Sequence, residues 1–328
     1  MKKTLSILSF SSISLLIALF VGSFTSCEGP AGPAGADANA HCLDCHSAEK
    51  WEAITASYEE HAHATGSSWA RGSSSSCQMC HSAQGFTAHL NGVDVDVTNP
   101  MAVDCEACHG DHGSLEEPVG PALATTSAPI SLADGETLLN VGDNSNMCAV
   151  CHQSRRGYAY YEAIDSVEIN DVNTPVPDGS VAINSSHAGP HHSNQSNFLL
   201  GKGSYLAIES THSSQGCTDC HMGEPSDGMG GHTWVPTEES CTTCHSDGIP
   251  EGIDNFDTDL TAIANALVTA GALSLEDGEY HPHVGIVSAD EFEAFWAYMY
   301  LYEDQSHGVH NPPLAKALIN DAKSKLGI

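Results

Sequence analysis

The sequence predicts a mostly irregular fold in which short α-helices wrap around an interior that side chains alone do not fill. A helical C-terminal segment follows, and little β structure is expected. Three observations lead to this prediction. Large side chains are scarce, with 6% aromatic residues against 30 glycines and 15 prolines. The chain is rich in cysteine and histidine, with 13 and 20 residues. Helical periodicity is strong only after residue 250, whereas residues 41–250 show little helical or strand period.

The charge of the chain excludes one class of partner. The chain has 10 lysines and arginines against 42 acidic residues, a formal net charge of −32. Nucleic acid binding needs a cationic surface that neutralises phosphates, so we expect no nucleic acid partner. Charged residues make up only 16% of the chain, which also distinguishes it from charge-rich disordered tails.

The irregular region contains the pentapeptide Cys-x-x-Cys-His six times. Two residues between the cysteines place both thiols on one turn of backbone, where they can form thioethers with the two vinyl groups of one haem. The histidine that follows then binds the iron. Zinc sites and disulfide frameworks also use paired cysteines, but neither requires a histidine after every pair. The thiols are those of Cys42, Cys45, Cys77, Cys80, Cys105, Cys108, Cys148, Cys151, Cys217, Cys220, Cys241 and Cys244, and the proximal iron ligands are His46, His81, His109, His152, His221 and His245.

Six covalently bound haems would supply the apolar core that the side chains lack. The predicted fold is therefore that of a multihaem cytochrome c, with loops and short α-helices wrapped round a stacked haem core. Successive motif histidines are separated by 35, 28, 43, 69 and 24 positions. The short separations, between motifs two and three and between motifs five and six, predict closely stacked haem pairs.

The chain has 14 histidines outside the motifs, more than enough to give every iron a second imidazole. We therefore expect mostly bis-histidine ligation. Methionine is the competing ligand and would raise the reduction potential. The weaker candidates of this kind are Met101, Met222, Met229 and Met299.

Several segments around these histidines resemble bacterial multihaem c-type cytochromes, a group that includes the subunits of extracellular cytochrome filaments (nanowires). The segments are residues 63–66, 189–205, 217–222, 230–233 and 308–312. The resemblance implies an electron-transfer protein and a homopolymeric filament as one mode of assembly, with a surface-tethered monomer as the other. It also implies distal iron ligands at His63, His112, His212, His232 and His310, with His191 or His192 as the sixth and His41, His61, His89 and His187 in reserve.

The only three arginines of the chain all lie beside haem motifs. Arg71 precedes the second motif, and Arg155 and Arg156 follow the fourth. Haem propionates need cationic partners in so acidic a chain, so we expect these guanidinium groups to pair with propionates rather than remain solvated.

Residues 251–328 form the predicted helical segment, which we expect to pack on the haem core. Ser288 and Glu291 form a capping box, and Asn311 followed by Pro312 begins a further helix. Inward positions at helical spacing are Leu260, Ile263, Leu267, Val268, Phe292, Phe295, Trp296, Met299, Leu314 and Leu318. The carboxylates of Asp254, Asp257 and Asp259 could hold Ca²⁺ but match no standard calcium loop, so helix capping is the preferred interpretation.

The first 26 residues have the features of a lipoprotein signal peptide. Lys2 and Lys3 precede an apolar stretch over residues 13–21, and residues 24–27 resemble a lipobox that ends at Cys27. Cleavage by ordinary signal peptidase is the alternative. Lipidation of Cys27 would account for the one cysteine outside the haem motifs, and the Gly/Pro-rich residues 27–40 would form a tether to the haem domain at 41–250. We therefore expect an exported lipoprotein of the outer membrane or cell surface.

Electron transfer without catalysis is the function that these features favour. It would pass electrons through six mostly bis-histidine haems to or from redox partner proteins or an extracellular acceptor, with the lipid as the contact to the membrane. The alternative is a multihaem reductase of nitrite, hydroxylamine or a sulfur oxyanion, which needs one iron with an open position. All six motifs keep their histidine, so the sequence offers no reason for an open site and no catalytic residue.

Overall fold

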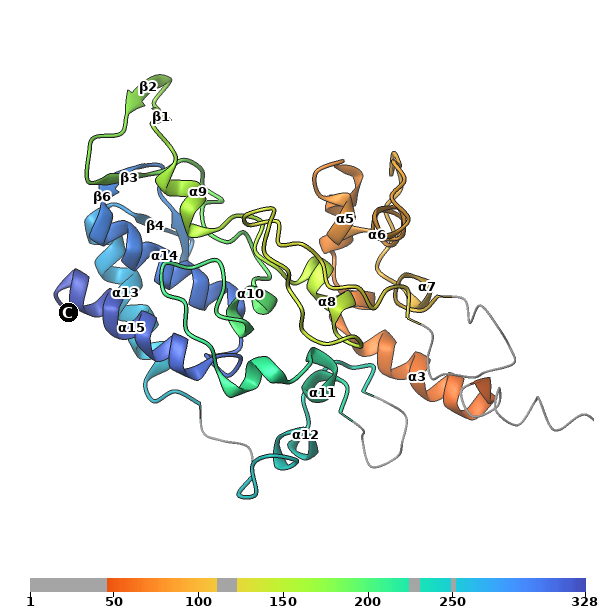
Figure 1. Cartoon of the computed structure of the whole chain (residues 1–328). Helices are drawn as coiled ribbons and strands as arrows, with labels where there is room; N and C mark the ends of the chain where they lie inside the picture. The colour runs from red at the N-terminus through yellow and green to blue at the C-terminus, as the bar shows by residue number, and fades with distance from the viewer. Residues whose placement is uncertain (1–45, 111–122, 224–230, 249–251) are drawn as a thin grey trace, which may run out of the picture. The chain divides into compact units, whose positions relative to one another are not determined.

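The computed structural model describes residues 46–110, 123–223, 231–248 and 252–328 (Figure 1). The chain divides into two units, residues 1–51 and 52–328, and the spatial contacts described below lie within the second. The predicted signal peptide (1–26), the lipidation site Cys27 and the tether lie outside the described residues. So do four of the predicted site residues, His41, Cys42, Cys45 and His112.

The cysteine-rich part of the chain consists of short helices joined by loops, as predicted. The helices in this part are short because glycine, serine and asparagine, which favour turns over helix interiors, interrupt the chain. Their bounds are α3 Ala48–Glu60, α4 Ala62–Thr65, η1 Ser68–Ser73, α5 Gln78–His81, α6 Ala83–Leu90, α7 Cys105–Cys108, α8 Asn146–Cys151, α9 Tyr158–Glu162, α10 Gln195–Leu199, η2 Thr211–Ser214, α11 Cys217–His221 and α12 Glu238–Thr242.

The β structure of the described residues consists of three antiparallel strand pairs. Two are hairpins, β1 Ser166–Ile169 with β2 Val172–Pro175 and β4 Leu273–Glu276 with β5 Glu279–Pro282. Their turns place Asn170, Asp171, Asp277 and Gly278 at positive φ, which is typical of two-residue hairpin turns. The third pair joins β3 Ser180–Ile183 to β6 Gly285–Ser288 across about a hundred residues of sequence. Short local patterns could not have predicted that pairing.

Three long helices form the C-terminal segment, as predicted: α13 Phe256–Ala270, α14 Ala289–Asp304 and α15 Pro312–Leu326. The predicted capping box is present at α14, because the backbone N–H of Ser288 donates to Glu291 Oε2 at 2.9 Å and that of Glu291 donates to Ser288 Oγ at 3.3 Å. The side chain of Asn311 accepts a hydrogen bond from the backbone N–H of Leu314 at the start of α15. Among the described residues, no helix combines the length and apolarity needed to cross a bilayer.

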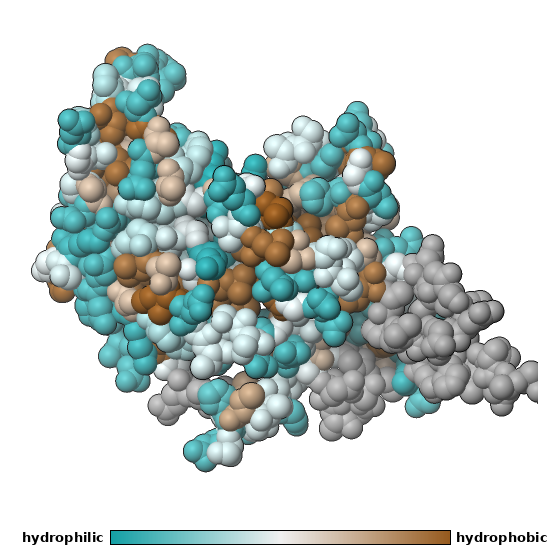
Figure 2. Space-filling view, viewed as in Figure 1, coloured by the Kyte–Doolittle hydropathy of each residue, from teal (hydrophilic) through white to brown (hydrophobic). Residues whose placement is uncertain are grey.

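These helices carry a side-chain core of ordinary kind. The fully buried Trp296, Phe295 and Tyr300 of α14 belong to one apolar cluster with Tyr161 and Phe198 from the cysteine-rich region. The clusters beside the haem motifs are much smaller, and one consists of Ala83, Phe86, Ala107 and Val150 with a few partly buried neighbours. Figure 2 shows apolar side chains reaching the surface in the middle of the face in view. Side chains therefore fill the C-terminal part and leave the motif-bearing part sparsely packed.

Asn311 joins the C-terminal helices to the cysteine-rich region, and its removal should destabilise the fold. Its buried amide donates to the carbonyls of Phe198 at 3.2 Å and Ile208 at 2.7 Å while it caps α15. Asn311→Ala should lower the free energy of unfolding by about 1–3 kcal/mol, because a cap is lost and two carbonyls lose a donor. Denaturant titration followed by circular dichroism measures the change. The control is Asn91→Ala, which removes an exposed hydrogen bond from the Asn91 amide to the Thr87 carbonyl. Equal effects of the two variants would contradict this role for Asn311.

Candidate haem-binding cavity

Each described motif folds as a single helical turn. The backbone N–H of the motif histidine donates to the carbonyl of the first cysteine, four residues earlier, at 3.0 Å for His81, 2.8 Å for His109 and 2.9 Å for both His152 and His245. The fifth motif is α11 itself. One such turn brings two thiols and one imidazole to neighbouring positions, as attachment of a single haem requires.

Five motifs line one continuous cavity. Its volume is about 3090 Å³, whereas ordinary ligand pockets measure ~300–1000 Å³. The lining includes six of the predicted distal ligands, His63, His191, His192, His212, His232 and His310. From the motifs it includes Cys77, Cys80, His81, Cys108, His109, Cys148, Cys151, His152, Cys217, Cys220, His221, Cys241, Cys244 and His245. A single cavity of this size, with attachment thiols throughout, suits several haems held together.

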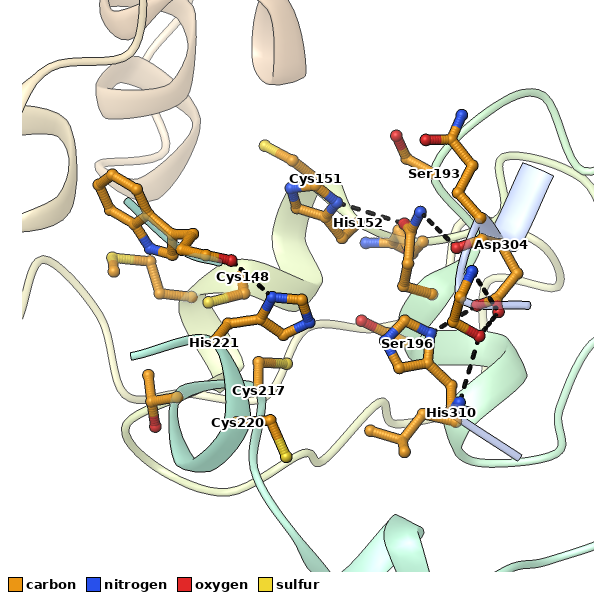
Figure 3. A pocket seen from close by; sticks show the side chains of 18 of the residues that line it. Cys148, Cys151, His152, Ser193, Ser196, Cys217, Cys220, His221, Asp304 and His310 are labelled. Carbon is orange, nitrogen blue, oxygen red and sulfur yellow. Dashed lines mark hydrogen bonds and ion pairs between the residues drawn. The ribbon is translucent and has the colours of Figure 1, made fainter. Parts of the chain in front are cut away.

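The fourth motif lies at the centre of this arrangement. The thiol of Cys151 donates to the carbonyl of Met79 inside the second motif at 3.8 Å and hydrogen-bonds the thiol of Cys80. The thiol of Cys148 hydrogen-bonds that of Cys217 in the fifth motif. Figure 3 shows the cysteines and histidines of the fourth and fifth motifs around one space. Motif four therefore contacts motifs two and five. The intervals on either side of motif four, 43 and 69 positions, are the longest between successive motifs, so spacing alone did not indicate these contacts.

The thiols suit conversion to thioethers. Burial raises the pKa of the Cys108 thiol to about 11, and the pKa of the Cys151 thiol is raised by its hydrogen bond to Cys80 and by burial. A thioether sulfur has no proton to lose and no charge to bury, so it is compatible with this apolar site. No disulfide joins any of the ten cysteines that the structure describes.

Four motif histidines each face one histidine from outside the motifs. The ring centroids are 6.1 Å apart for His63 and His152, 6.3 Å for His109 and His232, 6.2 Å for His212 and His245, and 6.1 Å for His221 and His310. The last pair is seen in Figure 3. Each pair joins a predicted proximal ligand to a predicted distal ligand.

The separation within these pairs is the one that a shared metal ion requires. An imidazole nitrogen lies about 2 Å from a metal it binds and about 1 Å from its own ring centre, so imidazoles on opposite sides of one iron have centroids about 6 Å apart. The adjacent rings of His61 and His63 are only 4.7 Å apart, and those of His191 and His192 are 4.9 Å apart. His187 and His191 are 6.1 Å apart, but neither follows a cysteine pair. The four pairs therefore fit bis-histidine iron sites.

Hydrogen bonds at Nδ1 orient the imidazoles of the cavity. A partner on Nδ1 fixes the ring and leaves Nε2 for a metal. The acceptors are the carbonyl of Val309 for His212 at 2.6 Å, the carbonyl of Trp234 for His221 at 2.8 Å, Gln195 Oε1 for His152 at 3.2 Å, Glu303 Oε2 for His192 at 2.8 Å and Asp304 Oδ1 for His310 at 2.7 Å.

Burial lowers the pKa of several imidazoles of the cavity, which favours the neutral form that binds a metal. Burial, with smaller contributions from His152 and His61, lowers the pKa of His63 to about 4. Burial likewise lowers the pKa values of His152 and His221. Burial also acts to lower the pKa of His310, but the Asp304 carboxylate outweighs it and the pKa is raised.

His192 lies in the same cavity as the second motif, near His81. The pKa of His81 is lowered first by burial and further by the nearby groups Arg71, His192 and Arg155. The hydrogen bond to Glu303 raises the pKa of His192 and fixes its ring. Burial lowers the pKa of His191 to about 4, and that ring lies beside His187. These contacts favour His192 over His191, a choice that the sequence left open.

Trp234 is a cavity residue that the sequence analysis did not identify. Its ring centroid lies 5.2 Å from that of His63 and 5.6 Å from that of His232, the distal candidates for motifs four and three. Its backbone carbonyl accepts the hydrogen bond of His221 from motif five. Its position two residues after His232 is the only signal in the sequence that could have indicated it.

The described reserve histidines are not among the four pairs with motif histidines. His61 lies against Trp234, with ring centroids 4.7 Å apart, and its Nδ1 accepts the backbone N–H of His63. His89 and His187 are exposed. His46 of the first motif is described but belongs to the first unit.

The three arginines differ in their surroundings. Arg155 lines the cavity. The guanidinium of Arg156 lies 4.7 Å over the ring of Tyr160, and Arg71 is exposed near His81. The buried hydroxyl of Ser196 also lines the cavity and has no hydrogen-bond partner, so it is free to meet a polar group such as a haem propionate.

The alternative metal sites gain no support from the described part of the chain. No three His, Cys, Asp or Glu side chains converge there on a point that would hold a metal ion. Asp257 and Asp259 lie in the first turn of α13, where Asp259 forms an ion pair with Lys323 at 2.6 Å. The helix begins after Asn255 without a side-chain cap, so these two carboxylates lie at the start of the helix but do not cap it as predicted.

The structure was compared with known proteins to identify its fold. No protein-family model matches the chain, and no curated protein matches it. Among solved structures, the outer cell wall cytochrome OcwA is similar, with a TM-score of 0.50 and 20% identity over 82% of this chain and 49% of OcwA. The chain thus spans about half the length of OcwA. An undecahaem cytochrome from the S-layer of Carboxydothermus ferrireducens has a TM-score of 0.45 at 17% identity, covering 77% of this chain and 38% of that one. The likeness to OcwA confirms the predicted fold, a multihaem cytochrome fold of short helices with little β structure.

Proposed function

We propose that the chain transfers electrons through six covalently attached c-type haems and has no catalytic activity of its own. The observation that carries the proposal is the set of four histidine pairs at 6.1–6.3 Å, each beside a Cys-x-x-Cys turn in one cavity. A haem bound at such a site supplies an iron that takes up and releases one electron. The contribution of the chain is to hold that iron from both sides.

Four of the proposed ligand sets follow from the pairs: His109 with His232 would hold the iron of the third motif, His152 with His63 that of the fourth, His221 with His310 that of the fifth and His245 with His212 that of the sixth. For the second motif we propose His81 with His192, which lies near it. For the first motif, His46 remains the proximal ligand expected from the sequence, and His112 remains an expected distal ligand without an assigned motif. Imidazoles on both sides of an iron leave no position for a substrate, which argues against the reductase alternative.

The contacts between motifs support a route for the electrons. The thiols of motif four touch those of motifs two and five, and helix α11 of motif five contacts α12 of motif six. The chain therefore brings the second, fourth, fifth and sixth sites into a continuous series. We propose that electrons pass along this series and that motif three joins it at motif four, near Trp234.

We further propose an extracytoplasmic location. The signal peptide, a lipid on Cys27 and the tether at 27–40 would hold the cytochrome on the outer membrane or cell surface, and the fold is shared with a cytochrome of the outer cell wall. Redox partner proteins or an extracellular acceptor would then exchange electrons with it. Assembly into a filament remains a prediction of the sequence resemblance.

The mature protein should contain six haems by mass and titrate reversibly. All six ferric haems should be low-spin, because both axial positions are filled by imidazole, and CO, nitrite and hydroxylamine should leave the spectra unchanged. Optical and electron paramagnetic resonance spectroscopy of protein from a host that attaches haem c provides the test. A stoichiometric high-spin haem that binds nitrite would favour the reductase instead.

Loss of one distal imidazole should open one iron. In His212→Ala, one haem of the six should become high-spin and bind CO, because His245 then holds the iron from one side only. The matched control is His89→Ala, an exposed histidine of the same cavity, which should leave every haem low-spin. A fully low-spin His212→Ala protein would refute the pairing.

Arg155→Gln should lower the reduction potential of one haem. A guanidinium beside a propionate stabilises the reduced iron, so its loss favours the oxidised state. We expect a shift of tens of millivolts, where about 59 mV is a tenfold change for one electron. Arg156→Gln removes the same charge from a side chain held over Tyr160 and should shift the potential less. Spectroelectrochemical titration compares the two, and equal shifts would show that Arg155 has no specific partner.

A further inference from the structure

We propose that Glu303 and Asp304, the last two residues of α14, are positioning residues that hold the distal imidazoles of two different haems and lower the reduction potentials of those haems. The inference rests on the proposed haem ligation. It proposes that one helix end sets the reduction potentials of two separate haems. Neither the haem-attachment motifs nor the fold specifies this role.

The two carboxylates contact two distal histidines directly. Glu303 Oε2 accepts a hydrogen bond from His192 Nδ1 at 2.8 Å, and Asp304 Oδ1 accepts one from His310 Nδ1 at 2.7 Å. Their side chains are only 7% and 1% exposed. His192 serves the second motif and His310 the fifth in the proposed ligation. Consecutive residues of a helix point about 100° apart, so neighbours in sequence can reach two different sites.

The end of α14 is held in place on several sides. The amide nitrogen of Gln195 donates to the last carbonyls of the helix, at 3.3 Å for Glu303 and 3.2 Å for Asp304, and its oxygen faces His152 Nδ1 at 3.2 Å. The backbone N–H of Ser306 and the Ser306 hydroxyl donate to Asp304 Oδ2. The proposed ligands of motifs two, four and five thus meet at one helix end. Figure 3 shows His152 and His310 beside Asp304 there. Since α14 also carries the buried Tyr300, this end is anchored in the side-chain core.

The acceptor type distinguishes these histidines from others in the cavity. His212 and His221 donate to backbone carbonyls of Val309 and Trp234, which are neutral. A buried carboxylate is a stronger acceptor than a carbonyl and draws the Nδ1 proton toward itself. The imidazole then donates more electron density through Nε2, which stabilises the oxidised iron. His310 and His192 should therefore hold their haems at lower potentials than His212 holds its haem.

The test compares two isosteric variants with a charge-matched control. Asp304→Asn and Glu303→Gln keep the size of each side chain but remove the charge from the acceptor. Each should shift the preference of one site for oxidised over reduced iron by about tenfold, which raises the potential of that haem by about 59 mV. Asp290→Asn removes the same charge from an exposed position at the opposite end of α14 and should leave all six potentials unchanged. Spectroelectrochemical titration of the mature proteins measures the shifts.

A second background assigns each shift to its haem. In His310→Met the imidazole that Asp304 contacts is absent, so adding Asp304→Asn should cause no further shift, whereas adding Glu303→Gln should still raise one potential. Unmoved potentials in both single variants, with six low-spin haems present, would overturn the inference and leave the proposed function intact. A shift that persists for Asp304→Asn in the methionine background would also overturn it. Wild-type protein without haem would instead refute the proposed function. If Asp304→Asn fails to accumulate, Glu303→Gln decides the question alone.

Discussion

The structure depends on pairs of imidazoles that face each other across the space of one metal ion. The two members of each pair come from distant parts of the chain, such as His63 with His152 and His221 with His310, at ring separations of 6.1 Å. An iron held by both would therefore close a long loop of backbone, as a disulfide does in small exported domains. In the proposed ligation, this would explain how a chain with few large side chains between residues 52 and 250 can keep a defined fold. Bonds between iron and histidine would contribute there what apolar packing contributes in other proteins.

The chain combines that arrangement with a second kind of core. Trp296, Phe295 and Tyr300 of α14 are buried among side chains, with Tyr161 and Phe198 contributed by the cysteine-rich region. This core is continuous with the cavity through α14, whose packed residues lead directly to Glu303 and Asp304 at its end. A rigid helix thus presents polar groups to the ligand histidines, and rigid support of this kind keeps ligand geometry constant as the charge on the iron changes.

The sequence predicted the features that local patterns encode. The six motifs, the capping box at Ser288 and the cap at Asn311 depend on residues only three or four positions apart, and the structure shows the described ones as expected. Motif spacing predicted that motifs five and six lie together, which the contact of α11 with α12 supports, but it did not predict that motif four lies against motif two, because the loops between them fold back. The same limit applies to the β3–β6 pair, to Trp234 and to the choice of His192 over His191. Each depends on contacts between segments that have no shared local pattern.

X-ray absorption at the iron edge of the mature protein tests the central claim most directly, because it reports the atoms bound to iron. The account predicts six nitrogen neighbours for every iron at about 2 Å, from the porphyrin and two imidazoles, with no sulfur or oxygen among them. The averaged spectrum should be the same in the absence and presence of nitrite. An average below six ligands, or a sulfur neighbour from methionine, would contradict it.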